Sequence, residues 1–321
     1  MAREEARAGP GRRRSASLRS SRRTAGPRSR EADQTVPPSS RHRFLAADRY
    51  RVEREWLRYE GTPQRDLFRE LRERFLLRHA TGTGWAVDLG SGPLRFTPLL
   101  GGEHARCVAL DLSAAMLRQG PVPASLADRW PIERVQGDAV RPPLRPHHFA
   151  TVGLLGNALG FAGSESIDLL SSALSLVAPG GRVLIEIAPG PGEHSRYLAR
   201  LPEGAVGRLL RSPPVLVGRR IRAEGFVEDP PRRVEPGTFA RWDPRDLATE
   251  LVRRGFAVEE TLSVAPALGS DPTRVAAARG DPKAWARLLE LEESLGRDPE
   301  RWPRAAAVLV AAALPPGGMI M

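Results

Sequence analysis

Apolar and polar positions repeat along this chain with two different periods, and the change of period predicts where helices and strands lie. Residues 62–79 carry an apolar stripe at helical spacing, formed by Leu67, Phe68, Leu71, Phe75 and Leu76. Thr62 and Pro63 fit the cap and first turn of this helix. Residues 43–60 read as another helix, separated from it by Gly61. Two helices are therefore expected before the first strand.

From residue 83 onward the pattern changes to short apolar runs between polar, glycine-rich or proline-rich stretches. Five of these runs are predicted strands: 86–89, 107–111, 134–136, 149–155 and 182–187. A helix that starts near Ser164 or Ser166 is expected to end before Pro179, with one apolar face made of Ile167, Leu170, Leu174 and Val177. Residues 141–148 contain too many prolines for a long helix. This alternation predicts an α/β fold with a doubly wound, mostly parallel sheet.

The C-terminal third supplies the rest of the predicted sheet. Residues 189–240 are less regular and are expected to form an insertion with a short helix at 194–201 and a strand pair at 215–227. A helix capped by Asp243 follows, then a strand, a second helix and a last strand over 305–314. On the first of these helices Leu247, Leu251 and Val252 are expected to face inward. The strand is predicted from the alternation of Phe256, Val258, Leu262 and Val264, and the second helix runs through Trp285, Leu288, Leu289 and Leu295 and ends at Gly296. These two strands make a seven-stranded sheet.

The chain has 321 residues and a formal net charge of +11, most of which lies in its first 43 residues. That segment has twelve arginines, four acidic residues and almost no apolar side chains, which predicts a disordered tail over 1–43. Lys283 is the only lysine, so a genome rich in G and C explains the arginines without a binding role. A transit peptide and an arm that binds nucleic acid are the alternatives.

Cysteine content and hydropathy indicate the compartment. Cys107 is the only cysteine, which excludes an intrachain disulfide and favours a reducing compartment. The longest apolar run, 305–314, is too short to cross a bilayer, so a cytoplasmic protein without a membrane partner is expected. One cysteine and scattered histidines do not have the spacing of metal ligands, so no metal site is expected.

Residues 85–100, WAVDLGSGPLRFTPLL, run from the first predicted strand through two glycines into a predicted helix. Gly90 and Gly92 allow a ligand to approach the backbone at a helix N-terminus. A dinucleotide loop has glycine or alanine where this chain has Arg95, which disfavours NAD. Asp111, about 20 positions further on at the end of the second strand, fits any ribose with free hydroxyls. The loop therefore indicates a different nucleotide-like ligand.

Two further carboxylates narrow the choice of ligand. Asp88 lies at the end of the first strand, where it can accept hydrogen bonds and face a cationic group. Asp138 follows the third strand and is placed to accept a hydrogen bond from the exocyclic amine of a purine. Both features, together with the predicted seventh strand, discriminate between the nucleotide-binding folds.

Four motifs occur in order along the chain: AVDLGSGP at 86–93, ALDLS at 109–113, QGDA at 136–139 and LVAPGGRVLIEIAP at 176–189. Through these motifs the chain resembles, over roughly residues 45 to 315, the class I S-adenosylmethionine-dependent methyltransferases of the Rossmann-like, small-molecule type. The resemblance implies S-adenosyl-L-methionine as the cofactor, held by Asp88, Gly90, Ser91, Gly92, Asp111, Leu112, Asp138, Ala139 and Asn157. Asp88, Gly90 and Gly92 would lie along the amino-acid part of this cofactor. Asp111 would bind the ribose, and Asp138 with Ala139 would contact the adenine.

Two loops differ from the family pattern or remain open to two interpretations. Leu94 stands where the family often has a third glycine, which mainly allows close helix packing. After the fourth strand, GLLGNALGF at 153–161 lacks the Asn-Pro-Pro-aromatic signature of enzymes that methylate nucleic-acid bases. It is similar to the corresponding loop of small-molecule methyltransferases. Asn157 either orients a substrate or cofactor amine or satisfies the loop backbone.

Methyl transfer from a sulfonium is an in-line displacement with an activated leaving group, so positioning supplies much of the catalysis. An alcohol or ammonium acceptor also needs a proton acceptor. His194 and Tyr59 are the candidates, with solvated loop histidine and packing aromatic as the alternatives. Glu186 either faces the substrate or is satisfied within the fifth strand. His147 and His148 lie together at the other end of the sheet and are assigned no role.

The preferred hypothesis is methyl transfer to an O, N or C atom of a small molecule. A helical lid over 44–82 and the insertion over 189–240 would cover the substrate on a methyltransferase domain over 83–315, with a short tail over 316–321. The first alternative is an RNA or protein methyltransferase that uses the basic tail. The second is a cofactor-binding protein without turnover, or an aminopropyl-transferring relative. The oligomeric state stays open.

Overall fold

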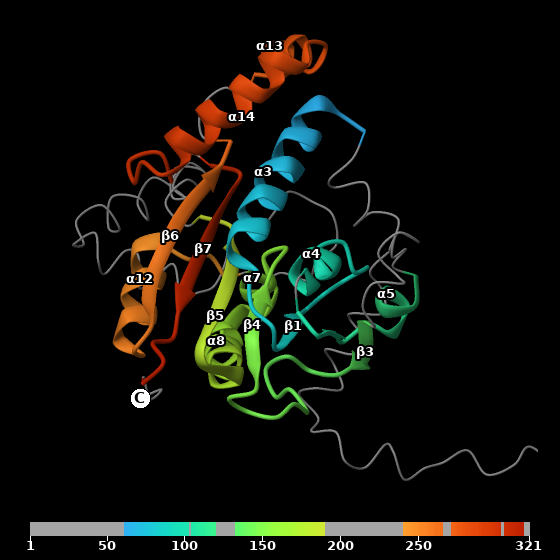
Figure 1. Ribbon diagram of the computed structural model, residues 1–321, viewed down its shortest axis with the longest axis vertical. Coiled ribbons are helices and arrows are strands. Elements are labelled where there is room, and N and C mark those ends of the chain that lie inside the picture. Colours follow the sequence, from blue (N-terminus) through green and yellow to red (C-terminus); the bar gives the residue numbers. More distant parts are fainter. Residues whose placement is uncertain are drawn as a thin grey trace, which may run out of the picture. The chain divides into compact units, whose positions relative to one another are not determined.

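The computed structural model describes residues 61–102, 104–119, 132–189, 240–265, 271–302 and 305–317. The predicted tail over 1–43, the helix expected at 43–60 and the elements expected at 194–201 and 215–227 lie outside these residues. The described residues include a seven-stranded sheet and the helices on both of its faces (Figure 1).

The sheet has the strand order β3-β2-β1-β4-β5-β7-β6. Its strands are β1 (Trp85–Leu89), β2 (Arg106–Asp111), β3 (Ile132–Gln136), β4 (Phe149–Leu154), β5 (Val177–Ile187), β6 (Ala257–Val264) and β7 (Ala307–Ala313). Strands β1 to β5 are parallel to their neighbours, whereas β7 is antiparallel to both β5 and β6. The predicted class is confirmed: an α/β fold with a doubly wound, mostly parallel, seven-stranded sheet.

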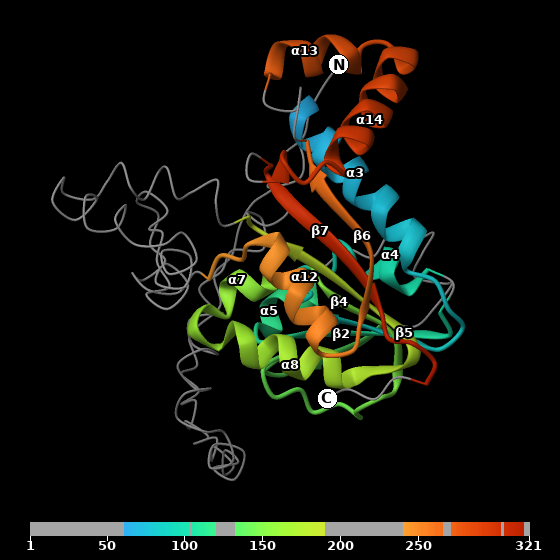
Figure 2. The same ribbon diagram turned by 90° about the vertical axis from the view of Figure 1, so that its left-hand side faces the viewer.

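Two layers of helices bury the two faces of this sheet. One layer packs through a buried cluster that includes α3 (Pro63–His79), α4 (Thr97–Gly101), α13 (Pro272–Arg279) and α14 (Pro282–Gly296). The other contains α8 (Ser166–Leu176) and α12 (Pro244–Arg253). Figure 2 shows α12 and α3 on opposite sides of the sheet. Two short helices, α5 (Ala114–Gln119) and α7 (Ala158–Phe161), follow the ends of β2 and β4.

Helix α3 is an integral part of the first layer. Its N-cap, Thr62, accepts a hydrogen bond from the Arg65 amide at 3.3 Å, as the sequence predicts. The predicted stripe is buried at Leu67, Leu71, Phe75 and Leu76, and Phe68 packs partly buried beside them. Burying these side chains against the sheet explains why α3 forms here. The lid predicted over 44–82 stays a prediction, since its first half lies outside the described residues.

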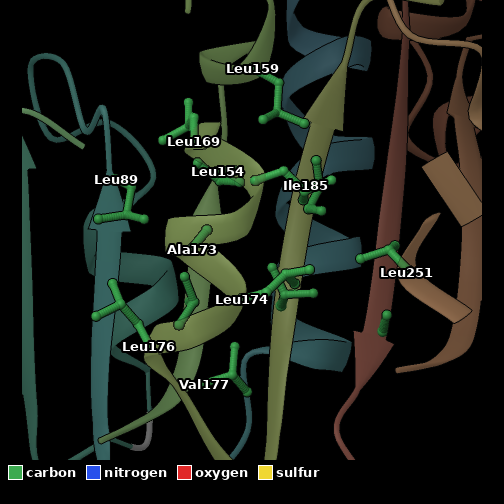
Figure 3. Close-up of a cluster of buried hydrophobic side chains, with 14 of the residues drawn as sticks. Leu89, Leu154, Leu159, Leu169, Ala173, Leu174, Leu176, Val177, Ile185 and Leu251 are labelled. Carbon is green, nitrogen blue, oxygen red and sulfur yellow. The ribbon is translucent and has the colours of Figure 1, made fainter. Parts of the chain in front are cut away.

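Helix α8 fills the centre of the second layer, and two details of its prediction are wrong. Its inward face is made of Leu169, Leu170, Ala173, Leu174 and Leu176. Figure 3 shows four of them, Leu169, Ala173, Leu174 and Leu176, within the buried cluster. Ile167 is 47% exposed. It lies about 100° around the helix from the buried Ser166, which places it at the margin of the buried face. Val177 is buried but begins β5, where it pairs with Phe149. Strand β5 therefore begins earlier than the predicted residue 182.

Each of the C-terminal helices α12, α13 and α14 begins directly after an aspartate N-cap. Asp243 caps α12 through the Arg245 amide, and Leu247 and Leu251 are buried as predicted. Val252 is 61% exposed, a correction that follows from its position about 140° around the helix from Leu247. Helix α13 was not predicted, although Asp271 before its first proline is the same cap signal. Helix α14 ends at Gly296 as predicted, with Trp285, Leu288 and Leu289 buried and Leu295 partly exposed.

Candidate functional site

The glycine loop connects the end of β1 to α4 in a conformation that depends on left-handed residues. Gly90 and Gly92 have φ values of 74° and 54°, which glycine adopts without strain. The amides of Gly90 and Ser91 donate to the Leu110 carbonyl at 2.8 and 3.1 Å. The loop is thereby fixed to the end of β2, at the edge of the sheet where parallel strands of such folds bind ligands.

The two glycines have different surroundings. A Cβ atom on Gly90 would lie 3.3 Å from the Cβ of Ala158, the first residue of α7. A Cβ atom on Gly92 would meet no described heavy atom within 4 Å. The backbone at Gly92 is therefore open to a ligand, whereas Gly90 is needed for close packing against α7.

Leu94 adapts to the place of the third glycine. It has a φ of 62°, in the left-handed region that leucine rarely adopts. Its side chain is 1% exposed and packs with Ala109 of β2 and Leu117 of α5. The side chain thus lies under the loop, where its burial offsets the backbone strain.

Asp88 is the most unusual carboxylate of the site. It is 2% exposed at the end of β1, and its Oδ2 accepts a hydrogen bond from Thr97 Oγ1 at 2.7 Å. Its Oδ1 is buried and has no hydrogen-bond partner in the part of the chain that the structure describes. Burial raises the pKa of the Asp88 carboxyl to about 7; the charge of Asp111 adds to this rise and the Thr97 hydrogen bond opposes it. A cationic ligand group beside Oδ1 would stabilise the ionised form.

Asp111 is held rigidly by the loop that it faces. Its Oδ2 accepts from the Gly92 amide and its Oδ1 from the Ser113 amide, both at 2.8 Å. Each carboxylate oxygen has further acceptor capacity, so the same group can also bind ligand hydroxyls. Leu112, partly buried, follows it, and its carbonyl accepts from Gln136 Nε2 at 3.1 Å.

Asp138 and Ala139 lie in the turn after β3, beside the Asp111 position. The Gly137 amide donates to the Asp111 carbonyl at 3.0 Å, which connects this turn to the end of β2. Asp138 Oδ1 accepts from the Val140 amide at 2.9 Å, and Ala139 packs against the core. The parallel pairing of β1 with β2 and of β2 with β3 therefore brings the carboxyl ends of these strands, with their predicted site residues, to one edge of the sheet.

Asn157 and Ser91 complete the predicted set. Asn157 is 8% exposed, and its Oδ1 accepts from the Ala188 amide at 3.1 Å, which is the contact expected if it satisfies the loop backbone. Ser91 is also 8% exposed, and its Oγ is buried without a hydrogen-bond partner among the described residues. Asp88 Oδ1 at the end of β1 and Ser91 Oγ in the glycine loop are therefore both buried without a hydrogen-bond partner among the described residues.

Three residues near the site were not assigned to it from the sequence, or were left open. Thr97 lies nine positions after Asp88 and donates a hydrogen bond to it. This spacing predicts the hydrogen bond only when the conformation of the loop between the two residues is known. Glu186 is 3% exposed and pairs with Arg72 of α3, so its carboxylate is satisfied within the fold. No sequence signal distinguishes Arg72 from the many other arginines of the chain.

Other candidates lie outside the described residues or away from this edge. The proposed proton acceptors Tyr59 and His194 belong to the part of the chain that is not described, so their roles stay predictions. His147 and His148 precede β4, at the opposite edge of the sheet. In the described ranges, no group of three histidine, cysteine or acidic side chains is arranged to hold a metal ion. None of the described helices is long and apolar enough to span a membrane.

The strand order, with an antiparallel β7 between β5 and β6, is that of the Rossmann-like class I methyltransferase fold. No protein-family model matches the chain, and no curated protein matches it. Among solved structures, it is similar to geranyl diphosphate C-methyltransferase from Streptomyces coelicolor A3(2), with 14% identity, 87% of this chain and 98% of that chain covered, and a TM-score of 0.48. It is also similar to N-methyltransferase NodS from Bradyrhizobium japonicum, with 11% identity, coverage of 86% and 98%, and a TM-score of 0.46.

Proposed function

We propose that this protein binds S-adenosyl-L-methionine and transfers its methyl group to an O, N or C atom of a small-molecule acceptor. The observation that carries the proposal is the buried Oδ1 of Asp88, which has no hydrogen-bond partner among the described residues. A buried carboxylate oxygen without a partner is costly unless a ligand supplies a donor. The ammonium group of an amino-acid ligand supplies both the donor and the compensating charge.

The remaining site residues fit the other parts of this cofactor. Ser91 Oγ offers a hydroxyl next to the amino-acid part. Asp111, fixed by two backbone amides, has acceptor capacity for the two ribose hydroxyls. Asp138 and Ala139 lie in the adjacent turn, where the adenine would be held. The order from Asp88 to Asp111 to Asp138 along β1, β2 and β3 follows the length of such a ligand.

The chemistry needs little from the chain besides binding and orientation. The bound sulfonium supplies an activated methyl group and a neutral leaving group. The chain's part is to hold the acceptor atom in line with that methyl group and to keep competing water out. A proton from an alcohol or ammonium acceptor goes to a base, for which His194 and Tyr59 are proposed.

Calorimetry of the full chain with S-adenosylhomocysteine tests the cofactor assignment. The parent protein is expected to bind, and Asp88→Asn and Asp111→Ala are each expected to weaken binding by roughly tenfold or more, because each removes a charge-assisted contact. Asp168→Asn, at an exposed position of α8, is the matched control and should bind like the parent. No binding by the parent, or unchanged affinity in both site variants, would overturn the proposal.

The class of acceptor needs its own experiment, because the net charge of the first 43 residues also fits a nucleic-acid substrate. Metabolite fractions and tRNA fractions are offered to the full chain and to a variant that lacks residues 1–43. The small-molecule proposal expects transfer to a metabolite that is unaffected by the deletion. Transfer to tRNA that falls steeply with salt and disappears with the tail would support the RNA alternative instead.

A further inference from the structure

A buried ion pair joins α3 to the end of β5. Glu186 is the second-last residue of β5, and it faces the same side as Leu184, toward the layer that contains α3. Its Oε1 accepts from Nε and Nη2 of Arg72 at 3.0 and 2.8 Å. Arg72 Nη1 also donates to the Phe68 carbonyl at 2.9 Å, so the guanidinium is fixed within its own helix.

The second oxygen of Glu186 holds a turn. Its Oε2 accepts from the Gly156 amide at 3.2 Å. Gly156 and Asn157 are the two central residues of a turn closed by the Ala158 amide and the Leu155 carbonyl at 3.2 Å, and their φ values are 61° and 66°. Positive φ at both central positions is the conformation of a type I′ turn, which glycine and asparagine adopt more readily than other residues.

The same turn is bound a second time to the end of β5. Asn157 Oδ1 accepts from the Ala188 amide at 3.1 Å, so two side chains cross between the end of β4 and the end of β5 in opposite directions. The turn leads directly into Ala158, whose Cβ lies 3.3 Å from where a Cβ of Gly90 would be. A shift of this turn would therefore change the packing of Ala158 against the glycine loop at Gly90.

A buried ion pair is a poor way to stabilise a fold, because apolar side chains of similar size are often equally good or better. Its advantage is that it specifies one geometry, since a carboxylate held by a guanidinium has a fixed orientation. We infer that the Arg72–Glu186 pair is a positioning device: it holds the turn of residues 155–158 so that Ala158 supports the glycine loop at Gly90. This inference rests on the proposed cofactor site.

Two double variants distinguish the effect of the hydrogen bond from Gly156 to Glu186 from the effect of the charges of the ion pair. Arg72→Met/Glu186→Gln and Arg72→Met/Glu186→Leu both remove the buried charges and keep similar side-chain volumes. Only the glutamine can still accept from the Gly156 amide. Each double variant removes both charges of the pair together, whereas a single substitution at either position leaves the other charge buried and risks unfolding.

The readouts are S-adenosylhomocysteine affinity by calorimetry and hydrogen exchange of the Gly156 amide by NMR. The leucine variant is expected to bind roughly tenfold more weakly than the glutamine variant and to exchange at Gly156 at least tenfold faster. The control is Arg78→Met/Glu293→Gln, a more exposed ion pair at 2.8 Å between α3 and α14, which should match the parent in both measurements.

The two proposals fail in different ways. If the parent protein does not bind S-adenosylhomocysteine, the proposed function is wrong. If the parent binds and the two double variants have equal affinity and equal Gly156 exchange, the positioning role of Glu186 is wrong. Faster exchange in the leucine variant with unchanged affinity would also contradict it, because the turn would then not support the glycine loop.

Discussion

Thr97 Oγ1 donates a hydrogen bond to Asp88 Oδ2 at 2.7 Å inside the protein, and this contact distinguishes the two oxygens of the buried carboxylate. Thr97 is fully buried at the start of α4, and Asp88 is 2% exposed at the end of β1. Since Oδ2 is used by Thr97, Oδ1 is the atom without a partner among the described residues.

Replacing Thr97 with valine should weaken cofactor binding although Thr97 itself need not touch the ligand. Thr97→Val removes the hydrogen bond that opposes the rise in the Asp88 pKa, so the carboxyl becomes harder to ionise. We expect roughly tenfold weaker S-adenosylhomocysteine binding near pH 7, measured by calorimetry. Thr97→Ser keeps the hydroxyl and should restore most of the affinity; equal losses in both variants would point to packing instead.

Cofactor affinity should depend on pH through the same carboxyl group. In the proposed cofactor site the ionised form of Asp88 would pair with the ammonium group, and the pKa of this carboxyl in the protein is raised to about 7. Apparent affinity should therefore rise with pH up to about 7 and level off above it. Calorimetry in buffers of different ionisation enthalpy should detect proton release on binding below pH 7. A flat profile that Asp88→Asn shares would contradict this assignment.

The stability of the unliganded protein should depend on pH in the opposite direction. A carboxyl whose pKa is raised by folding binds its proton more tightly in the folded state, so its contribution is complete below pH 3.8 and is lost as the pH rises through about 7. Relative to Asp88→Asn, the parent should lose roughly 2 to 3 kcal/mol of unfolding free energy between pH 5 and pH 8. Denaturant titration of both proteins at the two pH values measures this difference.

The two glycines of the loop should tolerate alanine unequally. Both have positive φ, so alanine at either position should cost about 1 to 2 kcal/mol of backbone strain. Gly90→Ala must also fit a Cβ atom 3.3 Å from Ala158, whereas Gly92→Ala meets no described atom within 4 Å. We expect the larger loss of thermal stability in Gly90→Ala. A larger loss in Gly92→Ala would mean that the loop is packed differently.

Much of the fold follows from local physics that the sequence displays. Caps such as Thr62 and Asp243, the apolar stripe of α3 and the short apolar runs of the strands depend on neighbouring residues only. The errors lie where the apolar pattern of a helix does not define the edge of its buried face. Ile167 and Val252 are at the margin of such a face, and only the position of the helix on the sheet decides whether they are buried or exposed. Helix α13 was missed although its Asp271 cap is visible in the sequence.

The candidate site also combines features that the sequence predicts with contacts that only the structure reveals. The glycine pattern, Asp88, Asp111 and Asp138 stand at strand ends, and the rule that parallel strands present their carboxyl ends at one edge brings them together. The sequence by itself thus determined the fold class and the residues proposed for the cofactor. Only the tertiary structure decided that Thr97 orients Asp88 and that Arg72 meets Glu186, 114 positions away. Such contacts depend on how α3 and α4 pack against the sheet, which no local pattern specifies.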